Sequence, residues 1–532
     1  MAIITDYFFI DILLVLTPLV YILVWYLTNN NNYWSKRGVP NIRKELFLGI
    51  LTGKQSQADS VLELYKTFGG ERYGGFFQLR KPILMIRDPE LIHKVLVKDF
   101  TCFHDRDLPE LNYDPLSANL FSLKGQAWRT LRSKLIPTFS SGKIKGMFDQ
   151  VIMSTENLIE SLEGGAGYGV SDVESKAALS AFTLDVIASC AFGIHLSAQS
   201  PDFNKFKTVV KNIFTPSPLQ VVRFLLVILM PKLAEKLNLR PFPNEVGDYF
   251  IGLTRATMKH RKDNNIKRND YFQLLLTLKE QEEDGNHVGL STSDVTEEDA
   301  DVETHYAAGS NVHFSSSDSK RLFTEEVICA NSFIFLIGSE SISNTISLVL
   351  FELCRHPDIQ LKLQQEVDSM LVKCGGWSYE AVRDMVYLDQ IIQESQRMYP
   401  VLPLLTRECT RDYKIPDSDL TIEKGVLVMI PVEALHHDPQ YYPDPEQFKP
   451  ERFQGNNFKP SSTFLPFGDG PRICIAMRFA LMEVKSCLAR IMSQYSVKLS
   501  NKTQVPLKFV PGLFTPSVKG GIWLSFTKRR TT

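Results

Sequence analysis

The chain has 532 residues, of which 44% are hydrophobic and 22% charged, and its 59 basic residues nearly balance its 60 acidic ones. This composition indicates a globular protein with a large core and excludes a wholly disordered or fibrous chain. A net charge of −1 carries no global signature of nucleic-acid binding. The eight cysteines form no CxxC pair, and there is no HExxH, GxGxxG or Walker-type motif, so structural zinc, zinc-protease and nucleotide-binding sites are not predicted.

A mostly apolar run extends from Tyr7 to Leu27. As a helix it would reach roughly 31 Å, enough to span a bilayer core. No Lys or Arg precedes it and no small-residue cleavage site follows it, which favours an uncleaved anchor over a signal peptide. Basic residues follow the run, so the positive-inside rule predicts that the rest of the chain is cytosolic. We expect a transmembrane anchor over residues 1–32 and one cytosolic domain over residues 33–532.

Extended and helical patterns then alternate. Gly75 to Ile86 alternates like a β-hairpin that turns at Lys81-Pro82, and Asp88 provides the N-cap of a following helix. Helical patterns dominate to about residue 410, and short strand-like runs such as Gly425 to Pro431 come after it. The expected fold is mainly α-helical with a smaller β region.

Two further segments stand out by composition. Val221 to Met230 is strongly apolar but too short to span a bilayer, and a buried helix is slightly favoured over a surface that dips into the same membrane. Residues 281–320 are rich in Asp, Glu, Ser, Gly and Thr, which predicts a flexible acidic insertion.

Cys474 lies in a Gly/Pro-rich loop, residues 466–476, which leads into a helix expected from Met477 to about Gln494. At a helix N-terminus, backbone N–H groups and the helix dipole stabilise a thiolate and lower the pKa of the thiol. Such a thiolate suits a metal ligand. The alternative is a buried structural cysteine, and the spacing alone does not decide between the two.

A long helix capped by Thr324 is predicted from Glu325 to Cys354, and it is apolar on nearly every face. Its interior contains Gly338 and Glu340. A mid-helix glycine costs about 1 kcal/mol relative to alanine, and an unpaired buried carboxylate costs several more. Either the helix kinks and the acid faces solvent, or these residues form a functional site.

The motifs resemble those of the cytochrome P450 family. Phe467, Gly470, Arg472 and Cys474 match its FxxGxRxCxG haem-binding loop, with Ala476 where glycine is usual. The resemblance implies a haem b cofactor with Cys474 as the iron ligand. It also implies that the other three matching residues contribute to cofactor binding.

The resemblance extends to other segments. Gly338–Ser341 resembles the family's distal helix, which implies that Glu340 and Ser341 are the catalytic proton-relay groups, with Ile337 replacing the usual small residue. Trp128 and Arg132 resemble the WxxxR motif that reaches a haem propionate, and Arg407 stands where a further propionate ligand is expected. Glu394 and Arg397, at the common i, i+3 spacing, resemble with Arg452 the structural ion network behind the haem.

The family's substrate-facing segments imply an apolar pocket. Its expected residues are Phe103, Phe121, Phe333, Phe335, Ile337, Leu402, Leu404, Leu405, Leu513 and Phe514. Stretches such as Asp114–Ala118, Thr138–Lys143 and His436–Pro439 look most like the microsomal insect detoxification branch.

The implied activity is that of a haem-thiolate monooxygenase that oxidises lipophilic small molecules, either xenobiotics or endogenous lipids and hormones. Electrons would come from NADPH through a separate NADPH–cytochrome P450 reductase, with cytochrome b5 as a further partner, at the endoplasmic reticulum membrane. Two alternatives remain: a haem-thiolate isomerase, and a non-catalytic haem- or lipophile-binding protein. The reductase would dock on a face formed by six basic residues: Arg132, Lys134, Lys143, Lys145, Arg478 and Lys485. The alternative is that these six are scattered, solvated charges.

Overall fold

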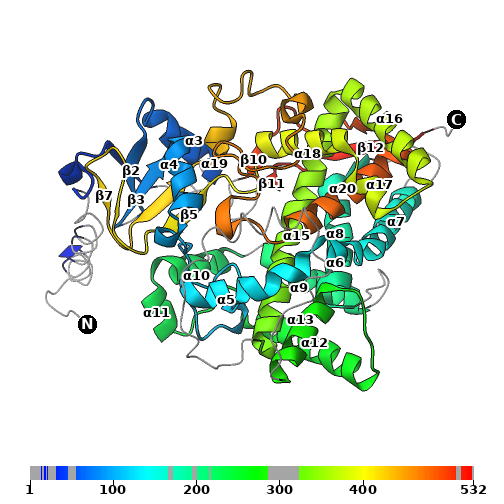
Figure 1. Ribbon diagram of the computed structural model, residues 1–532, viewed down its shortest axis with the longest axis horizontal. Helices are drawn as coiled ribbons and strands as arrows, with labels where there is room; N and C mark the ends of the chain where they lie inside the picture. The colour runs from blue at the N-terminus through cyan, green and yellow to red at the C-terminus, as the bar shows by residue number, and fades with distance from the viewer. Residues whose placement is uncertain are drawn as a thin grey trace.

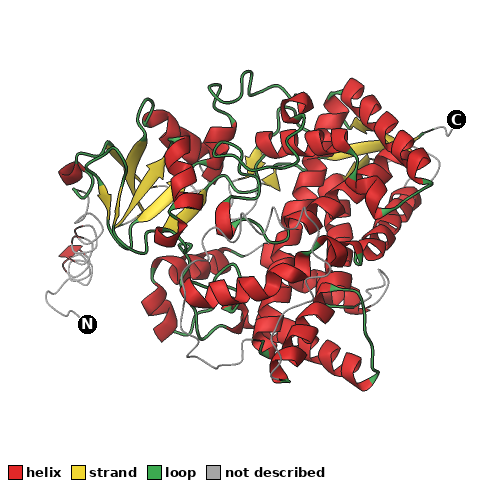
Figure 2. Ribbon diagram, viewed as in Figure 1, coloured by secondary structure: helices red, strands yellow, loops and turns green. Residues whose placement is uncertain are grey.

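A computed structural model describes residues 32–45, 55–78, 80–165, 172–194, 201–214, 217–284, 323–510 and 517–529, together with residues 14, 17, 18, 21 and 25. The described chain is mainly helical with a smaller β region, as the sequence predicts (Figure 2). Most of the predicted anchor, most of the acidic segment 281–320, and residues 511–516 lie outside the described residues.

The helical part is organised around α15 (Glu325–Arg355), which crosses the middle of the molecule (Figure 1). The side chain of Thr324 accepts a hydrogen bond from the N–H of Val327, and the helix ends at the residue before His356-Pro357, so its predicted bounds are confirmed to within one residue. Helix α8 (Ser175–Ala191) packs along it. The remaining helices are α3 (Gln57–Thr67), α4 (Pro89–His93), α5 (Gly125–Leu135), α6 (Ser141–Lys145), α7 (Phe148–Gly165), α9 (Pro201–Phe214), α10 (Pro218–Leu229), α11 (Pro231–Lys236), α12 (Asn244–Asp263), α13 (Tyr271–Glu283), α16 (Pro357–Cys374), α17 (Tyr379–Arg383), α18 (Val386–Met398), α19 (Val432–His436) and α20 (Met477–Gln494).

A five-stranded sheet, in the order β1-β2-β3-β8-β5, lies to one side of the helices. The predicted hairpin is confirmed, but Lys81-Pro82 is not its turn, because Lys81 pairs with Gln78 and Pro82 lies inside β3. Proline is tolerated there because it lies near the start of the strand, before Ile83, where pairing with β8 begins. The strands are β1 (Asn41–Glu45), β2 (Tyr73–Gln78), β3 (Lys81–Ile86), β5 (Leu405–Glu408) and β8 (Leu427–Ile430), with smaller sheets of β4 (Asp172–Glu174), β12 (Trp523–Lys528) and β9 (Tyr495–Leu499), of β6 (Tyr413–Lys414) and β7 (Thr421–Ile422), and of β10 (Phe509–Val510) and β11 (Ser517–Val518).

The described residues bury two large hydrophobic clusters, one among the helices and one beneath the five-stranded sheet. The loop that contains Cys474 runs between them. Leu465, at its start, belongs to the sheet cluster, whereas Phe467 and Ile475 pack against the helical cluster. Cys474 is therefore held at the boundary between the two parts of the fold.

Helix α10 is not the buried helix that its composition favours. It packs with α11 over a small cluster that includes Val227 and Ala234. Only one face of this pair of helices has a partner in the part of the chain that the structure describes. The large apolar side chains exposed on or next to these helices are Leu219, Val222, Met230, Leu233 and Leu237. Among the described residues, α15 is long and apolar enough to span a membrane but is mostly buried, and α9 with α10 meets the same criterion only as a pair bent by 59°.

Gly470 allows the Cys474 loop to approach the sheet side of the molecule. It begins the short 3₁₀ helix η8 (Gly470–Arg472) with a φ of +67°, and a Cβ there would lie 1.9 Å from the carbonyl oxygen of Leu96. Only glycine accommodates both conditions. Ala476 by contrast has a φ of −92°, so alanine at the position where the family motif has glycine introduces no backbone strain.

We predict that Gly470→Ala displaces the loop and lowers the midpoint of thermal unfolding. The matched control is Gly455→Ala, because Gly455 has a similar φ of +78° but no atom within 4 Å of the point that a Cβ would occupy. The control should cost about 1 kcal/mol from backbone strain alone, whereas Gly470→Ala adds a clash with backbone that cannot move aside. Equal shifts in the two variants would show that the close approach to Leu96 does not constrain the loop.

Candidate functional site

Cys474 is half-buried in the turn that precedes α20. Its N–H donates to the carbonyl oxygen of Phe467 over 2.9 Å, which folds the loop back on itself. Burial raises the pKa of the Cys474 thiol, although the N–H of Ala476 and the charges of Arg132 and Arg106 act in the opposite direction. The direction is opposite to the lowering expected from the helix N-terminus, because the loss of hydration is the largest effect on the pKa of this thiol.

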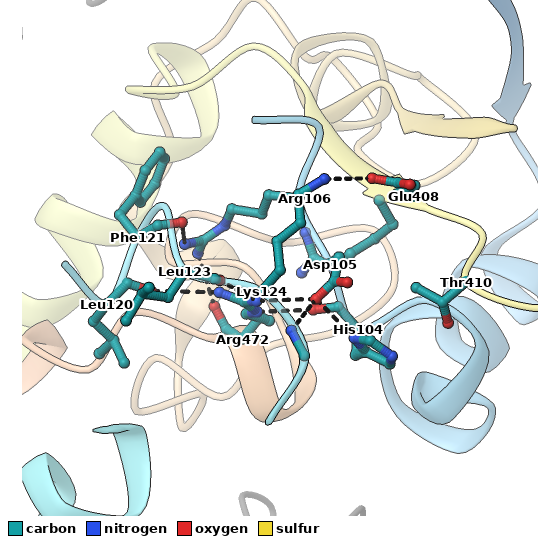
Figure 3. Close-up of polar contacts among 12 residues, drawn as sticks. His104, Asp105, Arg106, Leu120, Phe121, Leu123, Lys124, Glu408, Thr410 and Arg472 are labelled. Atoms are coloured by element: carbon teal, nitrogen blue, oxygen red, sulfur yellow. Dashed lines mark hydrogen bonds and ion pairs between the residues drawn. The ribbon is translucent and has the colours of Figure 1, made fainter. Parts of the chain in front are cut away.

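Arg472 joins this loop to the segment before α5. Its Nε donates to the carbonyl oxygen of His104 over 2.8 Å, and its terminal nitrogens donate to those of Leu120 (3.4 Å) and Leu123 (2.9 Å) (Figure 3). The Asp105 carboxylate lies 3.5 Å from Nη2. Most donors of this guanidinium group therefore hold the fold together, a contribution that the motif alone does not indicate.

Arg472 is one of four arginines gathered around the loop, with Arg106, Arg132 and Arg407. Arg132, from α5, donates to the carbonyl oxygen of Ile473 over 2.9 Å. Burial lowers the pKa of Arg407 to about 10. Burial and the neighbouring arginines lower the pKa of Arg106 to about 9 and that of Arg472 to about 8. The cluster is thus an electropositive region from which water is largely excluded.

This region also contains unused hydrogen-bond donors. Trp128 Nε1 and Arg407 Nε are buried and have no hydrogen-bond partner among the described residues. The guanidinium group of Arg472 lies 3.9 Å over the Trp128 ring, so the indole belongs to the same cluster. Arginine and indole N–H groups suit carboxylate oxygens, and charge-assisted hydrogen bonds are the strong ones. The residues present therefore fit a ligand that carries carboxylates, as a haem carries its propionates.

In the middle of α15, Gly338 leaves a short part of the helix uncovered, which we call the open stretch of α15. This residue is exposed although the helix around it is largely buried, and no atom lies within 4 Å of where its Cβ would be. Ser341 Oγ donates to the carbonyl oxygen of Gly338 over 2.5 Å. One turn earlier, the Phe335 ring lies 5.1 Å from that of Phe479 in the first turn of α20. The open stretch of α15 is therefore anchored to the helix that follows Cys474.

The Glu340 side chain does not face solvent, since it is only 12% exposed. It forms an ion pair with Lys176 at the start of α8, whose side chain is 27% exposed. Lys176 Nζ also donates to Ser517 Oγ over 3.3 Å. This pairing explains how a carboxylate remains inside the protein, because an unpaired buried charge would cost several kcal/mol.

Glu394, Arg397 and Arg452 lie together behind the Cys474 loop. Arg397 donates from Nε and Nη2 to the Glu394 carboxylate at 2.8 and 2.9 Å, and both side chains are fully buried. Arg452 Nε lies 3.3 Å from the same carboxylate. The remaining Arg397 donors reach the carbonyl oxygens of His436 (2.9 Å) and Pro445 (2.7 Å). One guanidinium group thus joins α18 to the end of α19 and to the segment that follows α19.

The residues expected around a substrate pocket are not all close to the open stretch of α15. Phe103 is fully buried against Tyr413, and Phe333 is buried against Phe250, so a pocket role for these two stays a prediction. Apolar type does not reveal which face of an element a residue occupies. The others divide by exposure: Phe335, Ile337, Leu404 and Leu405 are half-buried, Phe121 and Leu402 are exposed, and Leu513 and Phe514 lie outside the described residues.

Two of the basic residues expected on a docking face are buried. Arg132 reaches the Cys474 loop, and Lys485 forms an ion pair with Asp389 at 2.8 Å, so a surface role for both is wrong. Lys145 is exposed and pairs with Glu380. Lys134, Lys143 and Arg478 are half-buried.

Sequence reasoning missed Arg106 and Lys176. Arg106 donates to the carbonyl oxygen of Phe121 over 3.2 Å and to that of Arg472 over 3.3 Å. Neither residue lies in a motif, and each meets its partners only through contacts between segments far apart in the chain. Their one sequence signal is a basic residue in a segment next to a matched motif, which is too common to single them out.

Comparison with known proteins agrees with this geometry. The family model described as cytochrome P450 matches residues 43–522. Similar proteins include cytochrome P450 6a2 of Drosophila melanogaster, 35% identical over 94% of this chain and 96% of its own length, and cytochrome P450 9e2 of Blattella germanica, 35% identical over 96% of both. Cytochrome P450 6B2 of Helicoverpa armigera is 33% identical over 97% of this chain and 98% of its own length. The chain therefore belongs to the cytochrome P450 family and is a monooxygenase of the group that resembles these insect proteins.

Proposed function

We propose that this monooxygenase uses Cys474 as the thiolate ligand of a haem iron. The observation that carries the proposal is the position of Cys474: it lies beside the arginine cluster, and the helix that follows it contacts α15 one turn before the open stretch. Trp128, Arg132 and Arg407 would hold the haem propionates, and Arg106 joins them as a fourth donor. Haem, when bound, supplies the activation of dioxygen, which a thiolate ligand favours by donating electron density to iron.

The first test is the carbon-monoxide difference spectrum of the reduced protein. The wild type should show the family's Soret band at about 450 nm, and Cys474→Ala should lose it because the thiolate ligand is removed. Cys487→Ala is the matched control, since Cys487 is a fully buried free cysteine of α20, the helix that follows Cys474. A band that persists in Cys474→Ala, or is absent from folded and haem-loaded wild type, would refute the ligand assignment.

Glu340 and Ser341 are proposed to deliver protons to the oxygen-binding side of the haem. Ser341 presents its hydroxyl beside Gly338, where α15 is open. Glu340 lies next to it, and Lys176 connects its carboxylate to a half-exposed position at the start of α8. The ion pair holds Glu340 in one place, and an acid so placed can pass a proton inward and recover it from solvent.

Replacing the acid should separate electron use from product formation. Glu340→Gln keeps the shape of the side chain but cannot transfer a proton, so product formed per NADPH consumed should fall by about 10². Glu326→Gln, on the exposed first turn of the same helix, is the control. Unchanged coupling in Glu340→Gln would remove Glu340 from the proton path.

The substrates are proposed to be lipophilic small molecules, either xenobiotics or endogenous lipids and hormones. Phe335 and Ile337 are half-buried beside Gly338, so the side chains next to the open stretch are apolar. Leu405 approaches the Cys474 loop from β5, within 3.9 Å of the Cβ position of Gly468. Dependence of turnover on NADPH would separate this activity from a haem-thiolate isomerase, and product formation would separate it from a binding protein.

Electrons are proposed to arrive from NADPH–cytochrome P450 reductase, with cytochrome b5 as a further partner. The docking face is reduced to four basic residues on α5, α6 and α20, since the buried Arg132 and Lys485 do not reach the surface. Electrostatic complementarity acts chiefly on the association rate. The four residues are Lys134, Lys143, Lys145 and Arg478.

Neutralising these four residues to Gln should raise the reductase concentration needed for half-maximal turnover about tenfold, because steering charges are lost. The effect should shrink as salt is added, since exposed charges are screened. Lys424→Gln, an exposed change between β7 and β8, is the control. An unchanged reductase dependence at low salt would place the docking site elsewhere.

The proposed location is the endoplasmic reticulum membrane, with residues 1–32 as the anchor, the catalytic domain 33–532 facing the cytosol and residues 281–320 as a flexible acidic insertion. The exposed apolar side chains of α10 and α11 support contact with a lipid surface, because such side chains are costly in water. Fractionation of cells that express the full chain tests this location: recovery in the soluble fraction would contradict it.

A further inference from the structure

His436, the last residue of α19, has no role in the site described above. It is fully buried, and its Nε2 accepts a hydrogen bond from the N–H of Leu465 over 3.0 Å. Its ring lies 5.5 Å from that of Phe464 and 6.5 Å from that of Tyr442. The imidazole is thus fixed between two aromatic rings with one nitrogen directed at the backbone of another segment.

Leu465 is where the Cys474 loop begins. Its carbonyl oxygen accepts from the N–H of Gly468 over 3.1 Å, and the carbonyl oxygen of Phe467 accepts from the N–H of Cys474 over 2.9 Å. Three hydrogen bonds, the last two joined through the peptide bond between Phe467 and Gly468, therefore lead from His436 to the backbone of Cys474. A shift of Leu465 would be passed along this short, tightly turned segment to the sulfur atom.

On its other side His436 is held by the buried ion network. Arg397 Nη1 donates to the carbonyl oxygen of His436 over 2.9 Å, and Arg397 is fully buried with Glu394. The backbone of His436 is therefore fixed by a charge-assisted hydrogen bond, while its ring fixes Leu465. His436 thus connects the ion network directly to Leu465, beside a second connection in which Tyr442, under Arg397, donates to the carbonyl oxygen of Thr463 over 3.1 Å.

The ring is a suitable acceptor because it stays neutral. Burial, with the charges of His437 and Arg397, lowers the pKa of His436 to about 3. A neutral imidazole accepts at one nitrogen only, and the N–H of Leu465 assigns that role to Nε2, so the proton resides on Nδ1. Phenylalanine could fill the same space but could not accept this hydrogen bond.

We propose that His436 is a positioning residue for the haem thiolate: its Nε2 holds the start of the Cys474 loop in place and thereby keeps the sulfur atom in position to bind iron. This rests on the proposed function, since it presumes that Cys474 is the ligand. Loss of the acceptor leaves the N–H of Leu465 buried and unpaired, and relieving that cost requires the loop to move.

The experiment compares two substitutions at one position. His436→Phe keeps an aromatic ring between Phe464 and Tyr442 but removes the acceptor, whereas His436→Gln places an amide oxygen near the position of Nε2. His437→Phe is the matched control, because the adjacent His437 hydrogen bonds within α19, to the Glu433 carbonyl oxygen, and not to the loop.

Two measurements are made on each folded variant. The first is the rate at which the carbon-monoxide band at about 450 nm is lost on mild heating, which should rise about tenfold in His436→Phe and stay within about twofold of wild type in the other two. The second is deuterium uptake by peptides covering residues 465–476, which should accelerate only in His436→Phe. If the role of His436 were purely structural, His436→Phe and His436→Gln would lower thermal stability equally. The carbon-monoxide band would then be lost as fast in His436→Gln as in His436→Phe.

Wild-type band stability and loop exchange in His436→Phe would overturn the proposal, as would an equal effect in His437→Phe. If His436→Phe does not fold, His436→Asn takes its place, because the shorter asparagine side chain does not reach Leu465. Equal behaviour of His436→Asn and His436→Gln would then overturn the proposal. Failure of the proposed function is distinct, since wild type itself would lack the band. Deuterium uptake would still report whether His436 fixes the loop.

Discussion

The buried pair of Glu394 and Arg397 is the interaction on which the arrangement around Cys474 depends. Two charges removed from water are tolerated when further hydrogen bonds satisfy their remaining donors and acceptors, and Arg397 gains such bonds by reaching across to the carbonyl oxygens of His436 and Pro445. The pair therefore stabilises the fold less by its own attraction than by fixing where the chain must pass. From His436 the constraint continues to Leu465 and the loop.

Local signals in the sequence were sufficient for the main elements. Thr324 and His356-Pro357 mark the ends of α15 because capping and proline act within a few residues of where they occur. The hairpin was recognised from its alternation, but Lys81-Pro82 was wrongly taken as its turn, since proline is also tolerated at the start of a strand. Composition alone misjudged α10, because an apolar helix can be covered on one face only.

The chemistry of the site was less predictable, since it depends on contacts between distant segments. Cys474, Arg132 and Glu340 could be named from motifs, but the partners that explain them could not: Arg132 bonds to the Cys474 loop, and Glu340 pairs with Lys176. Phe103 shows the same limit, because residue type does not reveal orientation. The reversed pKa shift of Cys474 has a related cause, since the extent of burial is a property of the assembled fold.

The arginine cluster also bears on how much of the protein a cell retains. Positive charges that depress one another's pKa values make the folded chain costly by itself, whereas a dianionic ligand removes that repulsion. Binding to the native state alone shifts the folding equilibrium in proportion to the logarithm of ligand concentration. A change of about 1–2 kcal/mol alters cellular abundance several-fold. A haem whose propionates pair with these arginines would therefore stabilise the folded chain, and the unliganded chain would be the form more exposed to degradation.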